Sequence, residues 1–180
     1  MWIKTVGILL LFLILAVLQT TFLPHISIGG AVFNVVFVVF FTLAFFEKES
    51  TVSWQHLPVQ GLVVAAVVGC ILDAFSTHYF GPSIISLMTA YVAIKLLIHF
   101  LKERQSSYLF IYFILIFLVV FIGYGVLMDV LVQFPHVHIT MGVNKLVETG
   151  YNLLAAAMAY YVGQYIYFKQ KSDRQLKLFR

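Results

Sequence analysis

The sequence predicts an all-α membrane protein, a six-transmembrane-helix bundle whose N and C termini both lie in the cytoplasm. The first observation is composition: 62% of the 180 residues are apolar and 10% are charged, whereas soluble domains have about 45–50% and about 25%. The second is a series of six long apolar runs, and the third is an uneven distribution of lysine and arginine. A soluble fold of this length could not bury so much apolar surface, so we expect lipid to be the solvent for most of it.

A helix needs about 20 apolar residues to cross a bilayer, and we compare the length of each predicted span with this number. The first span ends at Pro24, and the second ends at the charged stretch 47–49. Pro82 opens the fourth span, because proline is favoured in the first turn of a helix. The second and third spans are short, and we expect them to be tilted or flanked by interfacial segments such as 50–57. The spans lie in a single transmembrane domain, residues 1–180, and cover about 3–23, 31–46, 59–75, 82–101, 108–133 and 146–168, with a basic cytoplasmic tail at 169–180.

Lysine and arginine determine the predicted orientation, since these residues concentrate on the cytoplasmic side of membrane proteins. With the N-terminus inside, ten of the 11 fall on the cytoplasmic side and only Lys145 falls outside. A topology with one span fewer or one span more would no longer place nearly all lysine and arginine residues on the same side. Lys95 lies slightly inside the fourth span, and we expect its long side chain to reach the cytoplasmic interface.

Polar residues within the spans gather in the outer half of the predicted bundle. An ionised side chain at the bilayer centre costs about 2.5–3.5 kcal/mol on insertion scales, so we expect the carboxylates to point inward, toward each other or toward a hydrated recess. Two interpretations stay open: the cluster caps helix ends and fixes their register, or it binds a ligand. The outer polar cluster contains Gln19, Asn34, Asp73, Asp129, Glu148 and Asn152.

Small residues recur at helical spacing in the third and sixth spans, where they allow helix backbones to approach closely. The seam in the third span ends in Asp73, and in the fifth span Gly123 and Gly125 precede Asp129. We therefore expect the third, fifth and sixth helices to pack together and to bring Asp73, Asp129 and Glu148 near one another. The two seams, which serve helix packing or a partner, contain Gly61, Ala65 and Gly69 in the third span and Ala155, Ala159 and Gly163 in the sixth.

Several patterns that membrane enzymes need are absent from the sequence. It has no H-E-x-x-H zinc-protease motif, no aspartates on neighbouring turns for phosphatidyl transfer and no glycine-rich phosphate loop. His136 and His138 could supply half of a metal site, but no further ligand accompanies them at a suitable spacing. The single cysteine, Cys70, excludes an intramolecular disulfide. We therefore expect no catalytic residue, no metal, no cofactor and no nucleic-acid partner.

The stretch 61–95 carries the most specific pattern of the chain. The pattern G-x-x-x-D-x-x-S-x-x-x-x-G is met by Gly69, Asp73, Ser76 and Gly81. This stretch resembles the MreD family of bacterial rod shape-determining membrane proteins. The pattern also has a purely structural interpretation, a helix hairpin, because Asp73 and Ser76 can bond the free backbone groups of a tight turn.

The resemblance extends to Gln19, late in the first span, and to the Ala90-Tyr91 pair, whereas Phe33-Asn34 lacks the proline that many members carry there. It implies a non-enzymatic, multi-pass scaffold or regulator of the cell-elongation machinery in the bacterial cytoplasmic (inner) membrane, which maintains rod shape and directs peptidoglycan synthesis. The implied partner is an MreC-like single-span protein. RodA and a class B penicillin-binding protein would be bound directly or indirectly, and MreB filaments indirectly.

A second function is the alternative to this scaffold. Substrate-binding subunits of energy-coupling factor vitamin transporters are also small six-helix proteins, and the outer polar cluster would suit a small solute. The seam of the sixth span resembles the small-residue surfaces with which such subunits dock their transmembrane partner. We expect a similar fold for either class, so neighbouring genes or a bound vitamin would discriminate between them.

Overall fold

The computed structural model describes residues 2–27, 32–47, 59–76, 79–101, 108–133 and 143–178. All regular secondary structure within these ranges is helical, which confirms the predicted all-α class. The elements are α1 (Trp2–Thr21), the 3₁₀ turn η1 (Leu23–Ile26), α2 (Val35–Phe46), α3 (Val59–Phe75), α4 (Pro82–Leu101), α5 (Leu109–Val132) and α6 (Val143–Leu178). The expected interfacial segment at 50–57 lies outside the described residues.

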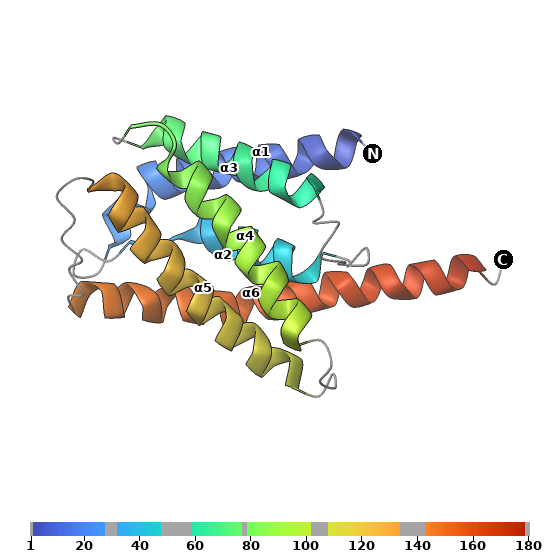
Figure 1. The fold of residues 1–180 in the computed structure, drawn as a ribbon. Helices are drawn as coiled ribbons and strands as arrows, with labels where there is room; N and C mark the ends of the chain where they lie inside the picture. Colours follow the sequence, from blue (N-terminus) through green and yellow to red (C-terminus); the bar gives the residue numbers. More distant parts are fainter. Residues whose placement is uncertain are drawn as a thin grey trace.

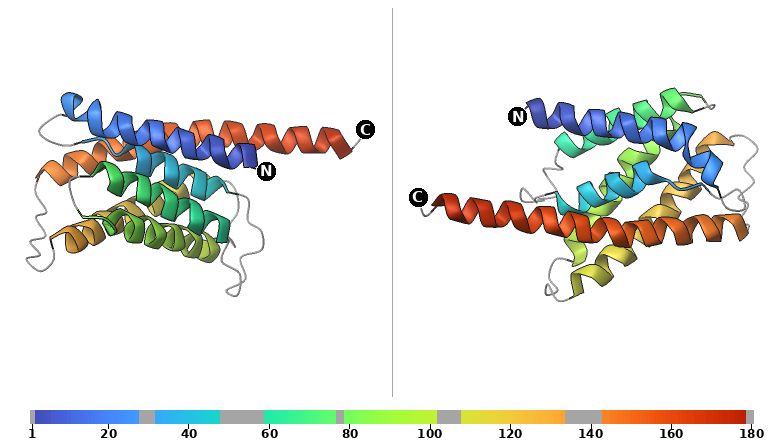
Figure 2. Two further views of the ribbon diagram at one scale, coloured as in Figure 1. Left: turned by 90° about the horizontal axis from the view of Figure 1, so that it is seen from above. Right: turned by 180° about the vertical axis from the view of Figure 1, so that it is seen from behind.

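Successive helices run in opposite directions, so the bundle has two ends (Figure 1). At one end α1, α3 and α5 finish and α2, α4 and α6 begin; we name it the Asp73 end. The opposite end, the Lys95 end, also holds both chain termini (Figure 1). Helix α6 has 36 residues and extends beyond the rest of the bundle at the Lys95 end (Figure 2). The predicted last span stopped at residue 168, but no glycine or proline after Gly163 interrupts the helix before Leu178.

Helix α2 occupies the centre of the bundle, and seven of its 12 residues are buried. The other helices contact one another in the order α1, α3, α4, α5, α6, and α2 packs against α6, α4 and α1. The expected packing of α3 on α5 and α6 is wrong: α3 packs on α4 and α1, and only α5 and α6 pack together. The reason is local, since α3 and α4 form a tight hairpin that occupies the small-residue face of α3.

Aromatic rings form the contact between α2 and α5. Phe41 lies with its ring centroid 5.1 Å from that of Phe113 and 5.0 Å from that of Phe117, both edge-to-face. Phe37 contacts Phe117 and Phe45 contacts Phe113 in the same way. Edge-to-face pairs contribute about 0.5–1.5 kcal/mol beyond their burial, so this ladder is an apolar link between α2 and α5 in addition to the packing of α2 on α6 and α4.

Glycine allows the closest helix approach, which is between α3 and α4. A Cβ atom at Gly69 would lie 2.5 Å from the Cα of Ile84, so even alanine would push the two backbones apart. A Cβ atom at Gly61 would overlap the side chain of Tyr91. Ala65, between them on the same face, is fully buried. The seam of the third predicted span is therefore occupied by α4.

The outer surface of the described chain is apolar, with an ordered distribution of residue types. Midway along the outer helices the exposed side chains are aliphatic or methionine, for example Ile14, Leu115, Val119, Leu154 and Met158. The exposed aromatic side chains lie toward the two ends. They are Phe22, Phe75, Tyr79 and Phe80 at the Asp73 end, and Phe100, Tyr108, Phe110, Tyr161 and Tyr165 at the Lys95 end.

Two helices of the described part are long and apolar enough to cross a membrane: Pro82–Phe100 with 19 residues and Leu109–Val132 with 24. The apolar stretches Val6–Thr21, Val35–Phe46 and Val59–Phe75 are shorter. Length and composition by themselves thus identify two candidate spans.

We expect Gly69→Ala to lower the free energy of unfolding by about 1–3 kcal/mol, because the added methyl group overpacks the α3–α4 contact. Gly123→Ala is the matched control, since a Cβ atom there has no neighbour within 4 Å. Thermal unfolding of the detergent-purified variants measures the difference. Equal midpoints for the two variants would contradict the close contact.

Candidate functional site

Asp73 lies at the end of α3 and is 4% exposed. Its Oδ2 accepts a hydrogen bond from the Gly81 N–H at 2.8 Å, and its Oδ1 accepts one from the Ser83 N–H at 3.0 Å. The first N–H groups of a helix have no partner within that helix, and the positive end of its dipole favours an anion. The Asp73 carboxylate therefore caps the start of α4.

The other residues of the glycine–aspartate–serine–glycine pattern complete the same turn. The Ser76 hydroxyl donates to the Asp73 carbonyl oxygen at 2.9 Å, and the Ser76 N–H donates to the same oxygen at 3.2 Å. Gly81 has φ of +128°, a conformation that side chains disfavour. Together with Gly69, these residues build one hairpin, as the purely structural interpretation of the pattern predicted.

Three amide side chains meet at the start of α2. Asn34 caps the helix, because its Oδ1 accepts a hydrogen bond from the Phe37 N–H at 3.0 Å. Gln19 of α1 accepts from the Val36 N–H at 3.0 Å. Asn152 of α6, which is fully buried, accepts from the Asn34 N–H at 2.9 Å. These amides satisfy the donors of a helix end that other helices surround.

The two other carboxylates of the predicted outer cluster lie on α5 and α6. Asp129, at the end of α5, forms an ion pair with Lys145 at the start of α6, and both side chains are partly exposed. Glu148 lies one turn after Lys145, and its carbonyl oxygen accepts from the Asn152 side chain at 2.8 Å. Both Asp73 oxygens bond the α3–α4 turn, but Asp73 and Glu148 both interact electrostatically with Tyr124 of α5, and Asp129 interacts with Glu148. The three carboxylates therefore lie in one region of the Asp73 end, as expected, although Asp73 and Asp129 each bond other groups.

The seam of the sixth predicted span faces the inside of the chain. A Cβ atom at Gly163 would lie 2.7 Å from the ring of Phe46 and 3.0 Å from the Thr42 methyl group, both on α2. Ala155 and Ala159 are partly buried and pack against the core. Both seams are therefore filled by helices of the chain itself, which leaves neither as a free surface.

A polar network at the Lys95 end was missed by the sequence analysis. Lys95 was expected to reach the interface, but it is 3% exposed. Its Nζ lies 2.8 Å from the Ala44 carbonyl oxygen and 2.9 Å from Glu47 Oε2. Tyr91 donates its hydroxyl to the same carboxylate oxygen at 2.8 Å. The only sequence signal was a lysine inside an apolar run; hydropathy does not indicate which acid it meets.

Gly81-Pro82-Ser83 is a G-x-S triplet, the pattern whose serine is the nucleophile of some intramembrane serine proteases, so the expectation that no such serine occurs is wrong. In the structure Ser83 is 4% exposed, and its N–H is bonded to Asp73. His78, the nearest histidine in the sequence, lies outside the described residues. No group of three or more His, Cys, Asp or Glu residues that could hold a metal ion occurs among the described residues.

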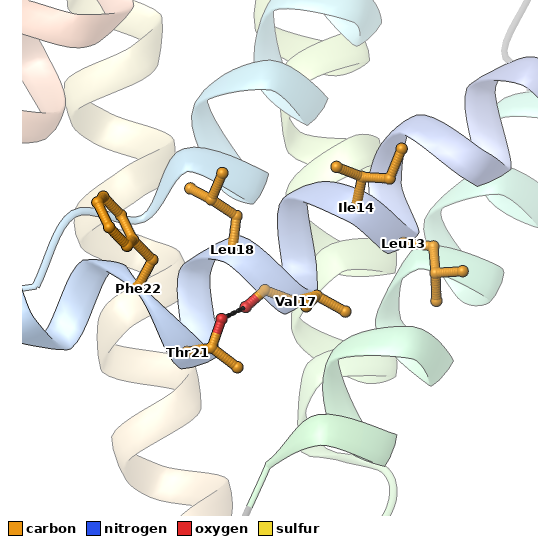
Figure 3. A pocket seen from close by; sticks show the side chains of 6 residues that line it. All are labelled: Leu13, Ile14, Val17, Leu18, Thr21 and Phe22. Carbon is orange, nitrogen blue, oxygen red and sulfur yellow. Dashed lines mark hydrogen bonds between the residues drawn. The ribbon is translucent and has the colours of Figure 1, made fainter.

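One shallow groove runs along the outer face of α1 (Figure 3). Thr21 is its only polar side chain, and the Thr21 hydroxyl donates to the Val17 carbonyl oxygen within the helix. The groove therefore offers an apolar surface without a free polar group. It is lined by Leu13, Ile14, Val17, Leu18, Thr21 and Phe22.

Comparisons with protein-family models, with curated proteins and with solved structures find no match to this chain.

We expect Asp73→Ala to lower the free energy of unfolding by about 2–4 kcal/mol, because two backbone N–H groups lose a charged acceptor. Asp129→Ala breaks a partly exposed ion pair and should cost about 0–1 kcal/mol. Thermal unfolding in detergent compares the two. A loss as large for Asp129→Ala as for Asp73→Ala would contradict the capping role.

Proposed function

We propose that this chain is a six-span membrane protein and a non-enzymatic scaffold of the MreD type. The observation that carries the proposal is the pattern formed by Gly69, Asp73, Ser76 and Gly81. All four residues act in the single hairpin between α3 and α4, and their polar groups serve its turn rather than a reaction. A pattern with this role suits a protein whose function is to hold a defined shape for its partners.

The surface supports a bilayer as the environment. Soluble proteins rarely expose apolar patches above a few hundred Å², yet the outer helices here expose aliphatic side chains such as Ile14, Val119 and Met158 along their middle. Exposed aromatic residues at both ends fit the two interfacial belts of membrane proteins. On this arrangement all six helices cross the bilayer, and the aromatic groups mark its two interfaces.

The lysine and arginine distribution supports an orientation with the Lys95 end in the cytoplasm. Both termini then lie inside, and the α3–α4 turn with Asp73 lies outside. The chain would be a multi-pass protein of the bacterial cytoplasmic membrane, and α6 would extend from the bilayer into the cytoplasm.

The proposed partner is an MreC-like single-span protein. Since the chain's own helices fill the small-residue seams, such a partner would have to bind an outer face, and the apolar groove of α1 is one such face. RodA and a class B penicillin-binding protein would join directly or indirectly, and MreB filaments indirectly. The scaffold would in this way direct peptidoglycan synthesis and maintain rod shape.

The alternative, a vitamin-binding subunit of an energy-coupling factor transporter, receives less support. A vitamin bound to such a subunit would need polar side chains at the Asp73 end that are not already hydrogen-bonded within the protein. Gln19, Asn34 and Asn152 are instead bonded to helix backbone, and Asp129 is paired with Lys145.

The orientation predicts the activity of alkaline phosphatase fusions, because this reporter is active only outside the cytoplasm. We expect activity for fusions after Ser27 and after Tyr79, and none for fusions after Leu101 and after Leu178. Green fluorescent protein at the same four positions, which fluoresces inside, should give the reverse. An active phosphatase after Leu178 would contradict the six-span arrangement.

The scaffold role predicts loss of rod shape when the gene is deleted in its bacterium, because the elongation machinery loses a component. We expect the wild-type chain and Asp129→Ala to restore the shape, and Asp73→Ala to fail. Affinity purification from native membranes should recover an MreC-like protein with the first two. Normal shape after deletion, together with no MreC-like protein in the purified fraction, would refute the proposal.

A further inference from the structure

The polar network at the Lys95 end joins three helices. Glu47, directly after the last residue of α2, accepts from Tyr91 at 2.8 Å and pairs with Lys95 at 2.9 Å, both on α4. The Lys95 Nζ lies 5.3 Å from the centroid of the Tyr91 ring. Gly61 of α3 leaves the space that the Tyr91 hydroxyl occupies. The network thus connects the central helix to the α3–α4 hairpin.

Lys95 also satisfies the backbone of α2. The last carbonyl groups of a helix have no partner within it, and the Lys95 ammonium donates to the carbonyl oxygen of Ala44 at 2.8 Å. Three separate groups therefore hold this ammonium, namely a carboxylate, a carbonyl oxygen and an aromatic face.

The Glu47–Lys95 pair depends on both of its members. Well-packed apolar residues can replace a buried ion pair with little or no loss of stability, whereas removing one partner leaves an uncompensated charge. Lys95 also has an alternative position. It lies six residues before Leu101, the last residue of α4, which is about 9 Å along the helix axis, and its long stem allows the ammonium to move toward the interface.

Glu47 and Lys95 differ in how exposed their side chains are. Lys95 is 3% exposed, whereas the Glu47 side chain is 35% exposed. A group arriving from outside the bundle therefore meets Glu47 first. The complementary group is a cation, and among protein side chains arginine binds carboxylates with the best geometry.

We propose that the Glu47–Lys95 pair is a latch that holds the end of α2 against the α3–α4 hairpin, and that a basic side chain of a partner protein opens it by binding Glu47. In the closed state Lys95 lies inside and bonds Glu47 and Ala44. In the open state Glu47 faces the partner, and Lys95 moves to the interface, which frees the last turn of α2. This inference rests on the part of the proposed function that places the chain in a bilayer. It does not depend on the MreD-like scaffold role.

The test measures access to the end of α2 in the full chain, reconstituted in phosphatidylcholine nanodiscs. Cys70→Ser removes the native thiol and Ala44→Cys reports on the buried last turn of α2. The rate of alkylation by a membrane-impermeant maleimide is compared in four backgrounds: no further change, Glu47→Gln, Lys95→Met, and both. We expect Glu47→Gln to raise the rate about tenfold, because Lys95 loses its counter-charge and leaves.

Lys95→Met removes the other half of the pair. It deletes the ammonium that holds Glu47 and the Ala44 carbonyl oxygen, so we expect the alkylation rate to rise about tenfold as well. Because both changes break the same latch, the double variant should react within about twofold of either single variant. Unchanged rates in the single variants, or an increase in the double variant equal to the product of two independent effects, would overturn the latch. If Glu47→Gln does not assemble, Glu47→Asp replaces it; the shorter side chain withdraws the carboxylate, and a rise that Lys95→Met does not increase further is again expected.

The partner's role is tested with a hexa-arginine peptide added to the same nanodiscs. We expect it to raise the alkylation rate of the reference about fivefold and to leave the Lys95→Met protein unchanged. An unchanged reference rate, or the same increase in both proteins, would overturn opening by a basic partner. Neither readout involves cell shape, so failure here is distinguishable from failure of the scaffold role.

Discussion

Helix α2 is short, central and surrounded by other helices, so the free backbone groups at both of its ends need partners from elsewhere in the chain. At its start, Gln19 of α1 and Asn152 of α6 accept from backbone N–H groups. Near its end, Lys95 of α4 donates to the Ala44 carbonyl oxygen. Unpaired backbone groups cost several kcal/mol in an apolar environment, and this requirement explains why Gln19, Lys95 and Asn152 are retained on α1, α4 and α6.

The same requirement explains Asp73, which supplies acceptors to the first N–H groups of α4. Of the residues predicted as one outer cluster, four cap two different helices and Asp129 forms an ion pair, whereas the partly buried Glu148 side chain has neither role; the four caps are Gln19, Asn34, Asp73 and Asn152. Chemistry directed at a ligand would need polar groups that are not already bonded in this way.

The sequence was most informative where structure is local. Apolar runs, Pro24, Pro82 and the charged stretch after α2 located the helices, and the turn at Asp73 was predictable because its partners lie at most ten residues away. Helix neighbours were not predictable, since α2 is apolar on every side and its hydropathy does not indicate a face. The Asn34–Asn152 bond spans 118 residues and the Lys95–Ala44 bond spans 51, so neither leaves a local signal.

The number of residues between bonded partners also determines the order in which the parts of the bundle can form. The α3–α4 hairpin closes through contacts between residues near in the chain, so it can form as soon as both helices have been synthesised. Helix α2 cannot complete its start in the same way, because Asn152 belongs to the last helix to be synthesised. Until α6 arrives, α2 keeps an unsatisfied backbone donor and an open flank. The newly made chain therefore passes through a stage in which its central helix is accessible from the side of α6, and synthesis of the final helix closes the bundle.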